Sequence, residues 1–180
     1  MYKFFQRTRR LVFLTSVCLG AQTLFSAAYA ASSEYDVKAT YIARFTEFVD
    51  WPAVADNVSF DICVLGAHPI ETPLAKLPAL IRVKNRTLQV LRINSIQAAT
   101  SCAIVFVPSS EASRMRALQK LVQGMPVLTV SDTPGLLAKG SLLNFYYEGD
   151  HLRFEIRLRA AEEAGLKFSS RLLKIATIGE

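Results

Sequence analysis

The chain has 180 residues, the length of one domain of ordinary size. It carries 21 basic and 15 acidic residues, for a net charge of +6. Residues 1–30 hold four of the basic residues and no acidic residue, so 17 basic and 15 acidic residues remain and the rest of the chain has a net charge of +2. A balance so close to neutral argues against a nucleic-acid partner, which calls for a strongly basic surface.

Residues 1–30 have the layout of a secretory signal peptide. A basic opening segment precedes the apolar stretch LVFLTSVCLG, and small residues follow at Ala28 and Ala30. The alternative is an uncleaved membrane anchor, but the apolar run is interrupted by polar residues and is short for a membrane span. We therefore predict a signal peptide over residues 1–30, cleaved near Ala30, and one exported domain over residues 31–180.

Export leaves two cysteines, Cys63 and Cys102, in an oxidising compartment. The count and the compartment favour a disulfide between them, and the alternative is two buried thiols that act as small hydrophobic side chains. A metal site is not expected, because only His68 and His151 could add ligands and no pair has close ligand spacing.

The first predicted element of the domain is an amphipathic helix that begins after Ser33 and ends before Pro52. Its aromatic residues recur at spacings of four and three, which is the period of one helix face; these residues are Tyr41, Phe45 and Phe48. Ser33 and Asp36 match a capping box. We expect the aromatic face to pack against a sheet and Trp51 with Pro52 to close the helix.

Residues 58–131 are predicted to alternate strands with helices. Strands are expected at 58–66, 86–93, 102–108 and 126–131, a short helix within 73–80, a single helical turn at 95–100, and a helix over 109–124 that begins at serine caps and ends at Gly124. The run at 102–108 is continuously apolar, as in a strand that is covered on both faces, and residues 126–131 are predicted to form another buried strand. A strand, a helix and a strand in this order predict a parallel, right-handed crossover.

Residues 142–158, LLNFYYEGDHLRFEIRL, predict a β-hairpin that turns at Gly149 and Asp150. Pairing Glu148 with His151 places six apolar residues on one face: Leu143, Phe145, Tyr147, Leu152, Phe154 and Ile156. The other face is then polar and carries Asn144, Tyr146, His151, Arg153, Glu155 and Arg157. A slip of one residue would mix the two faces, so this register is strongly favoured.

After the hairpin, we predict a helix to Glu163, a break at Gly165 and a second helix capped near Ser169, with Leu172, Leu173 and Ile175 facing inward. The whole pattern predicts an α/β fold in a single-domain sandwich. Its sheet is mixed and mainly parallel, ends in an antiparallel hairpin and is flanked by helices.

Two groups of side chains are candidates for binding. The polar hairpin face offers Tyr146, Arg153, Glu155 and Arg157 to a protein partner, and tyrosine and arginine are enriched at the energetic centres of interfaces. The alternative is a sheet face that is solvated or covered by the last helices. A basic group at spacings of four and three, formed by Lys167, Arg171 and Lys174, offers a contact for an acidic partner or an anionic ligand, or is a solvated helix face.

A catalytic interpretation receives little support. His68, Asp132, Ser109 and Ser110 all follow predicted strands, where active sites often lie. However, the chain has no nucleophile elbow, and the segment CVLGAHP lacks the glycines of a phosphate-binding loop. We therefore expect a protein that is not an enzyme, with no catalytic residues and no cofactor.

Several segments together resemble the YfiR family, whose domain is also called DUF4154. They are EYDVKATYIARFTEFVDWP, ICVLGAHP, CAIVFVPSSE, PVLTVSD and RFEIRLRAAEEAGLKFSSRLLKIA. The resemblance implies a mixed α/β sandwich in the periplasm that binds the periplasmic domain of an inner-membrane diguanylate cyclase. Binding would repress the synthesis of cyclic-di-GMP and hence biofilm formation.

The resemblance also implies a homodimer and a response to the redox state of the envelope through cysteines. Cys63 and Cys102 stand at the family's cysteine positions, but this chain lacks the further pair that some members carry in the C-terminal half. Redox control would therefore depend on Cys63 and Cys102 alone. A different hypothesis is a small-molecule-binding component of an envelope sensor or transport system, which predicts an apolar pocket with a few polar groups.

Overall fold

The computed structural model describes residues 34–52, 59–77, 83 and 86–179. The chain divides into two units, residues 1–38 and residues 39–180. In the first unit, residues 34–38 are helical and Lys38 forms an ion pair with Glu34. The predicted signal peptide and Ser33 of the predicted capping box lie outside the described residues. Across the described ranges, no helix is both long and apolar enough to cross a membrane.

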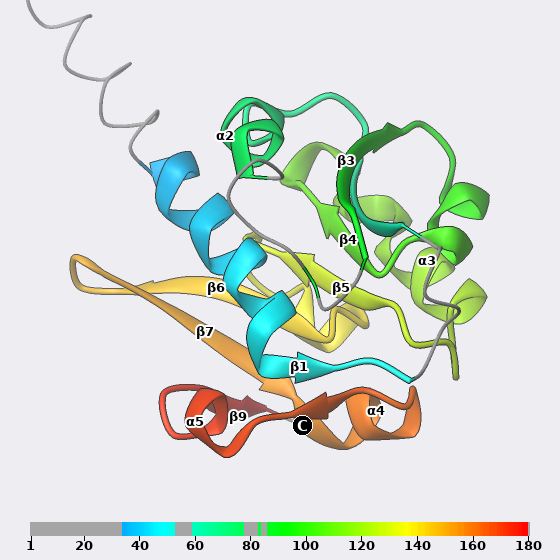
Figure 1. Ribbon diagram of the computed structural model, residues 1–180. Coiled ribbons are helices and arrows are strands. Elements are labelled where there is room, and N and C mark those ends of the chain that lie inside the picture. Colours follow the sequence, from blue (N-terminus) through cyan, green and yellow to red (C-terminus); the bar gives the residue numbers. More distant parts are fainter. Residues whose placement is uncertain (1–33, 53–58, 78–82, 84–85, 180) are drawn as a thin grey trace, which may run out of the picture. The chain divides into compact units, whose positions relative to one another are not determined.

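The second unit is built on a seven-stranded sheet with the order β3-β2-β4-β5-β6-β7-β9 (Figure 1). The strands are β2 (Phe60–Leu65), β3 (Leu88–Ile93), β4 (Ile104–Val107), β5 (Leu128–Ser131), β6 (Leu143–Glu148), β7 (His151–Arg157) and β9 (Thr177–Gly179). Neighbouring strands from β3 to β6 are parallel, β6 and β7 are antiparallel, and β9 is parallel to β7. The predicted α/β class, with a mainly parallel sheet and an antiparallel hairpin, is confirmed.

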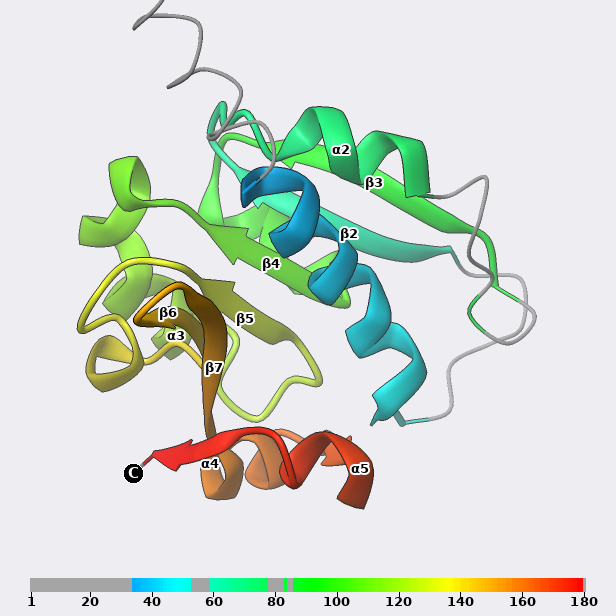
Figure 2. The same cartoon turned by 90° about the vertical axis from the view of Figure 1, so that its left-hand side faces the viewer.

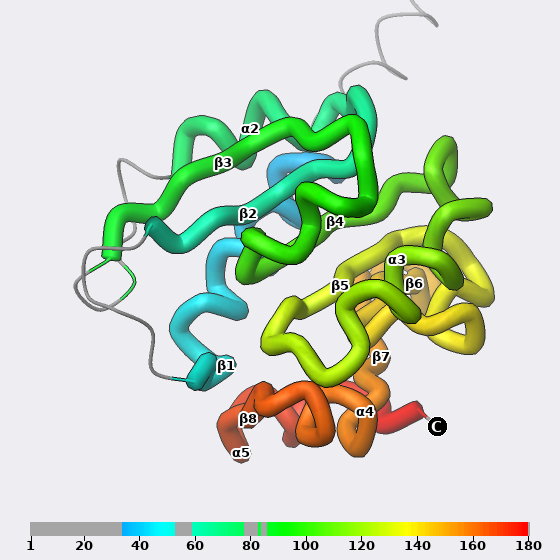
Figure 3. Tube along the Cα trace, turned by 90° about the vertical axis from the view of Figure 1, so that its right-hand side faces the viewer, coloured from blue at the N-terminus to red at the C-terminus, as the bar shows by residue number. Residues whose placement is uncertain are grey.

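The helical elements lie on both faces of this sheet. They are α2 (Glu71–Lys76), η2 (Ile96–Ser101), η3 (Ser109–Arg114), α3 (Met115–Leu121), η4 (Leu137–Lys139), α4 (Leu158–Glu163) and α5 (Ser170–Leu173). The path from β2 to β3 runs toward one edge, whereas the paths from β3 to β4 and from β4 to β5 run the other way. Right-handed crossovers therefore place α2 on one face and both η2 and α3 on the opposite face. Figures 2 and 3 show α2 and α3 on opposite sides of the sheet.

The predicted aromatic face of the first helix packs on the hairpin, which confirms that part of the prediction. The ring of Phe45 stacks on Phe145 at a centroid distance of 5.9 Å and meets Phe154 edge-on at 5.5 Å. Tyr41 contacts the same two rings at 6.1 and 6.0 Å. Such pairs add to the free energy gained by burying the aromatic area, so they fix the helix on this face of the sheet.

The predicted end of this helix is wrong. The helix ends at residue 48, and β1 (Val49–Asp50) follows as a strand that pairs antiparallel with β8 (Lys167–Phe168). Trp51 therefore does not close the helix. Its ring meets the ring of Phe60 edge-on, with the two centroids 4.9 Å apart. Its Nε1 donates a hydrogen bond to the carbonyl oxygen of Ala103 at 3.2 Å. Tertiary pairing outweighs the helical pattern here.

The helix predicted over residues 109–124 forms in two pieces, the 3₁₀ turn η3 and the α-helix α3. The serine caps are not made, because Pro108 occupies the N-cap position and no side chain caps η3. Met115 and Leu118 of α3 are buried against Cys63, Leu65, Val105 and Val107 of the sheet. This second core lies on the face opposite Phe45.

The C-terminal region shows the largest differences from the sequence prediction. The hairpin register is confirmed, with Glu148 opposite His151 and Phe145 opposite Phe154. The short strands β8 and β9 are not predicted, and the second C-terminal helix is only the four-residue α5. Leu172 faces inward, but Ile175 is exposed because the chain leaves the helix and turns into β9.

Gly165 joins α4 to β8 with a φ of +82°, and a Cβ atom added there would lie 3.3 Å from Cγ of Pro52. We predict that Gly165→Ala lowers the free energy of unfolding by about 1–2 kcal/mol, because alanine is strained in the left-handed region. Urea unfolding measures the change. Ser170→Ala, at an exposed position, is the control, and an equal loss in both variants would contradict the prediction.

Candidate functional site

The β6–β7 hairpin extends beyond both of its neighbours in the sheet. β5 pairs only with Leu143 and Asn144 of β6, and β9 pairs only with residues 155–157 of β7. Residues 145–154 therefore form a two-stranded ribbon that projects from the sheet, as the yellow and orange strands in Figure 1 show. At the outer end of this ribbon, Tyr147, Glu148, His151 and Arg153 are exposed.

The base of the polar hairpin face is buried, which corrects the prediction for this part of the face. Asn144 is only 1% exposed, and its Nδ2 donates a hydrogen bond to Oε1 of Glu155 at 3.2 Å. The side chain of Leu137 in η4 packs directly on Gly179: a Cβ atom added to Gly179 would lie only 2.5 Å from Cδ2 of Leu137. Because Gly179 pairs with Arg157, η4 covers this face at the base, where Glu155 and Arg157 are half-buried.

The outer part of the polar face stays open. Tyr146 lies directly opposite Arg153, and its hydroxyl shares a 2.7 Å hydrogen bond with Oγ1 of Thr177 from β9. Nε of Arg153 donates to Oε2 of Glu148 at 3.2 Å, and the arginine side chain remains 48% exposed. Tyr146, Arg153 and Thr177 are called the hairpin surface below. The sequence did not indicate Thr177, because a strand of three residues has no readable pattern.

The predicted basic group is only partly brought together. Lys167 lies in β8, opposite Asp50 of β1, so an acidic neighbour faces it across the strand pair. Arg171 lies in α5 and Lys174 immediately after it, three residues on, so these two share one side of the turn. All three side chains are exposed.

A pocket of about 720 Å³ lies beside the end of β7. It is lined by Arg157, Leu158, Arg159, Ala160, Glu162, Glu163, Ile178 and Gly179. The charged groups at its rim include Arg159, whose Nε donates to Oε1 of Glu163 at 3.1 Å. The sequence prediction included only Arg157 of this set, since the pocket depends on β9.

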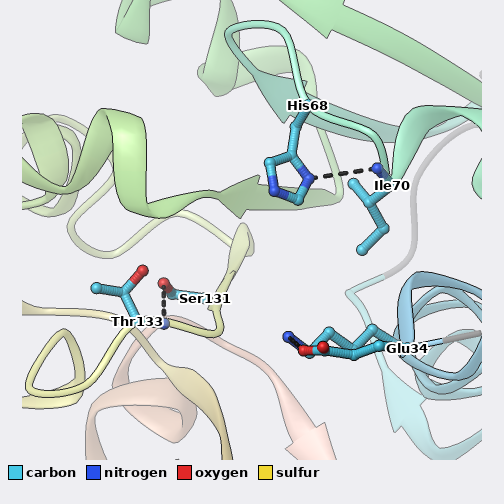
Figure 4. Close-up of polar contacts among 6 residues, drawn as sticks. Glu34, His68, Ile70, Ser131 and Thr133 are labelled. Carbon is cyan, nitrogen blue, oxygen red and sulfur yellow. Dashed lines mark hydrogen bonds and ion pairs between the residues drawn. The ribbon is translucent and has the colours of Figure 1, made fainter. Parts of the chain in front are cut away.

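The polar residues at the carboxyl ends of the parallel strands hold their own loops in shape. Nδ1 of His68 accepts a hydrogen bond from the backbone N–H of Ile70 at 3.3 Å, and its ring packs on Phe106. The Ser131 hydroxyl donates to the carbonyl oxygen of Val107. It also accepts a hydrogen bond from the N–H of Thr133, which Figure 4 shows. Ser109 and Ser110 are exposed in η3. Within the described ranges, no group of three or more potential metal ligands occurs.

Cys63 and Cys102 form a disulfide with a Cα–Cα distance of 6.0 Å. Both cysteines are buried in the core cluster beneath η2 and α3. The bond links the middle of β2 to the residue that leads into β4. Burial shields the sulfur atoms from solvent, so reagents reach this bond only when the surrounding core opens.

The comparison with known families gives a match that covers most of the chain. Residues 35–177 match the YfiR/HmsC-like family. The matched range includes the first helix from Tyr35, both cysteines of the disulfide, the entire hairpin and the C-terminal helices. Because the match covers most of the 180 residues, the chain belongs to the YfiR/HmsC-like family.

Proposed function

We propose that this protein is a periplasmic regulator that binds the periplasmic domain of an inner-membrane diguanylate cyclase and represses cyclic-di-GMP production. Family membership over residues 35–177 is the observation that carries the proposal. The proposal includes export through a signal peptide over residues 1–30, a domain over residues 31–180, and action without catalysis. Repression would limit biofilm formation.

The hairpin surface is the proposed contact with the membrane protein. It projects from the sheet, and its arginine is held in place by Glu148 while remaining half-exposed. Tyrosine and arginine supply large contact areas and several hydrogen bonds, which makes them frequent hot spots. The half-buried Glu155 and Arg157 would lie at the rim of this contact.

Regulation follows from selective binding. A protein that binds one conformation of its partner more tightly shifts the partner's population toward that conformation. A shift from mostly active to mostly inactive cyclase requires a difference in binding of about 5 kcal/mol between the two states. A second copy of the chain, as the family resemblance implies, would present two hairpin surfaces to a dimeric cyclase and add avidity.

We predict that Arg153→Ala weakens binding to the membrane partner by about 30-fold, the usual effect of removing one hot-spot side chain. Co-purification of the tagged protein with envelope proteins identifies the partner, and titration of its isolated periplasmic domain measures the affinity. Arg92→Ala is a matched control. Arg92 is also an exposed arginine (53%) that forms an ion pair with a glutamate, Glu71, but it lies on β3, at the edge of the sheet far from the hairpin.

Wild-type affinity in Arg92→Ala, with unchanged melting temperatures in both variants, would assign the loss to the hairpin. Equal affinities for Arg153→Ala and wild type would show that the hairpin is not the contact. Failure to recover any membrane signalling protein would contradict the proposal as a whole.

The pocket beside β7 favours a second candidate function, a small-molecule-binding component of an envelope sensor or transport system. Its volume of about 720 Å³ suits a small ligand, with apolar walls at Leu158 and Ile178 and charged groups at Arg157 and Glu162. A ligand at 100 times its Kd would add about 2.7 kcal/mol to the free energy of unfolding. A thermal-shift screen with no hit, beside a stable protein complex, would decide against this candidate.

A further inference from the structure

The C-terminal end of the chain carries an exposed surface that combines aliphatic and basic side chains. Ile175 is 60% and Ile178 51% exposed, and Ile175 is the most exposed large hydrophobic residue within the described ranges. Arg171 and Lys174 are exposed beside them in the sequence. These four residues, Arg171, Lys174, Ile175 and Ile178, are called the C-terminal patch. An exposed apolar group of this kind marks an interaction site more often than isolated apolar residues do.

The fold holds the C-terminal patch in a fixed orientation. Ser169 caps α5 by accepting a hydrogen bond from the N–H of Leu172, whose own side chain is buried. Arg171 is followed by Lys174 and Ile175 at spacings of three and four, so the three side chains are neighbours on this turn, and all three are exposed. Strand β9, which carries Ile178, is tied to β7 by parallel pairing, with Ile178 opposite Ile156. Figures 1 and 2 show α5 and β9 next to each other at one end of the second unit.

Two of the three basic residues in this segment form no ion pair in the part of the chain that the structure describes. Residues 167–179 contain three basic and no acidic residues. Lys167 faces Asp50, but across the described ranges no acidic side chain forms an ion pair with Arg171 or Lys174. The exposed Arg92 and Arg153 are each paired with a glutamate, whereas Arg116 and Lys120 of α3 are exposed and form no ion pair within the described ranges, which makes them the matched comparison. The patch is therefore complementary to a negatively charged surface.

We propose that the C-terminal patch docks on an anionic phospholipid bilayer. Protein segments that lie at a membrane surface combine two kinds of side chain. Lysine and arginine contact the lipid headgroups, and neighbouring aliphatic side chains enter the outer part of the acyl layer. A protein hot spot would instead favour an exposed aromatic anchor, and the patch has none. Docking would keep the protein at the membrane surface and raise its effective concentration near membrane proteins. This contact is independent of the proposed function and requires no protein partner.

The test uses the exported protein, purified without detergent, and sedimentation with lipid vesicles that contain no protein. Vesicles of phosphatidylglycerol and phosphatidylethanolamine are compared with vesicles of phosphatidylcholine alone. We expect binding only to the phosphatidylglycerol vesicles, and a loss of binding as NaCl rises from about 0.05 M to about 0.5 M. Arg171→Glu with Lys174→Glu should weaken binding at least about 30-fold, since each basic residue near an anionic surface contributes about fivefold.

The matched control reverses two exposed basic residues on another helix, Arg116→Glu with Lys120→Glu in α3. It has the same net charge as the patch variant and should keep wild-type binding apart from a small uniform loss. Ile175→Ser should lower binding by about fivefold through lost apolar contact. Circular dichroism confirms folding of each variant.

Three results would overturn the proposal. The first is wild-type protein that stays in the supernatant with phosphatidylglycerol vesicles. The second is an equal loss in the α3 and patch variants, which would reflect net charge alone. The third is a patch variant that binds phosphatidylglycerol vesicles as well as the wild type does but loses a membrane-protein partner in envelope extracts, which would assign the patch to an acidic protein surface.

Discussion

Phe45→Ala is expected to lower the free energy of unfolding by about 3–5 kcal/mol. Phe45 is buried at the centre of the aromatic cluster, stacked on Phe145 and edge-on to Phe154. Its removal would leave a cavity between the first helix and the hairpin, and both partner rings would lose contacts that neighbouring side chains cannot replace. A loss this large is a sizeable fraction of the stability of an ordinary domain.

Urea unfolding followed by circular dichroism measures this change. Phe48→Ala is the control, because Phe48 lies in the same helix but is only half-buried, so its loss should be clearly smaller. If Phe45→Ala cost less than about 1.5 kcal/mol, the helix would not be fixed on the hairpin by this cluster. The sheet face would then have to be stabilised mainly by its aliphatic residues.

The second large effect is expected from removal of the disulfide. The bond between Cys63 and Cys102 closes an interval of 39 residues. In the chain-entropy account, such a loop stabilises the folded protein by roughly 4 kcal/mol. The double variant Cys63→Ala with Cys102→Ala should therefore unfold at a much lower urea concentration than the oxidised wild type.

The wild type supplies its own controls. Dithiothreitol should reduce the stability of the wild type toward that of the double variant and leave the double variant unchanged. Because both cysteines are buried, reduction should be slow in buffer and fast in mild denaturant. Mass measurement without reductant should find no free thiol in protein from the periplasm. Two free thiols there would contradict the account.

These properties constrain any redox control. A buried bond between β2 and the start of β4 cannot act as an exposed chemical sensor, so its reduction would act by loosening the core beneath η2 and α3. The hairpin lies on the far side of β5 from this bond. Redox state would therefore change the amount of folded protein more than the shape of the hairpin surface.

Local patterns were sufficient to predict the regular parts of the fold. The hairpin register follows from six apolar residues that alternate with polar ones, since any slip would place charged residues in the core. The parallel strand β4 follows from a continuous apolar run, and all residues of β4 and of the next strand, β5, are buried as predicted. In each case, the local sequence and the tertiary environment favour the same structure.

The short strands could not be predicted, because their stability comes from distant partners. Val49 continues a helical pattern, yet it pairs with Phe168, more than 100 residues away. β9 has three residues and exists because Thr177, Ile178 and Gly179 lie beside β7. The same strand moves Ile175 from the expected core to the surface. It also contributes Thr177 to the hairpin surface and Ile178 to the pocket.

The sequence was sufficient to predict which residues share the polar hairpin face, but not which of them are exposed to solvent. Tyr146 and Arg153 lie on the outer hairpin, as the alternation indicated. Asn144 and Glu155 belong to the same face, but the base of this face is covered, and nothing in the hairpin sequence reveals that η4, a turn that precedes the hairpin in the chain, packs there. Distinguishing a covered polar face from an open one requires the tertiary structure.

The most direct test of the account is the cellular concentration of cyclic-di-GMP. It is measured in a deletion strain complemented with wild type, Arg153→Ala or Arg92→Ala at equal periplasmic amounts. We predict that deletion raises cyclic-di-GMP, that wild type and Arg92→Ala restore the low level, and that Arg153→Ala does not. A deletion strain with an unchanged level of cyclic-di-GMP would contradict the central claim that this protein represses its synthesis.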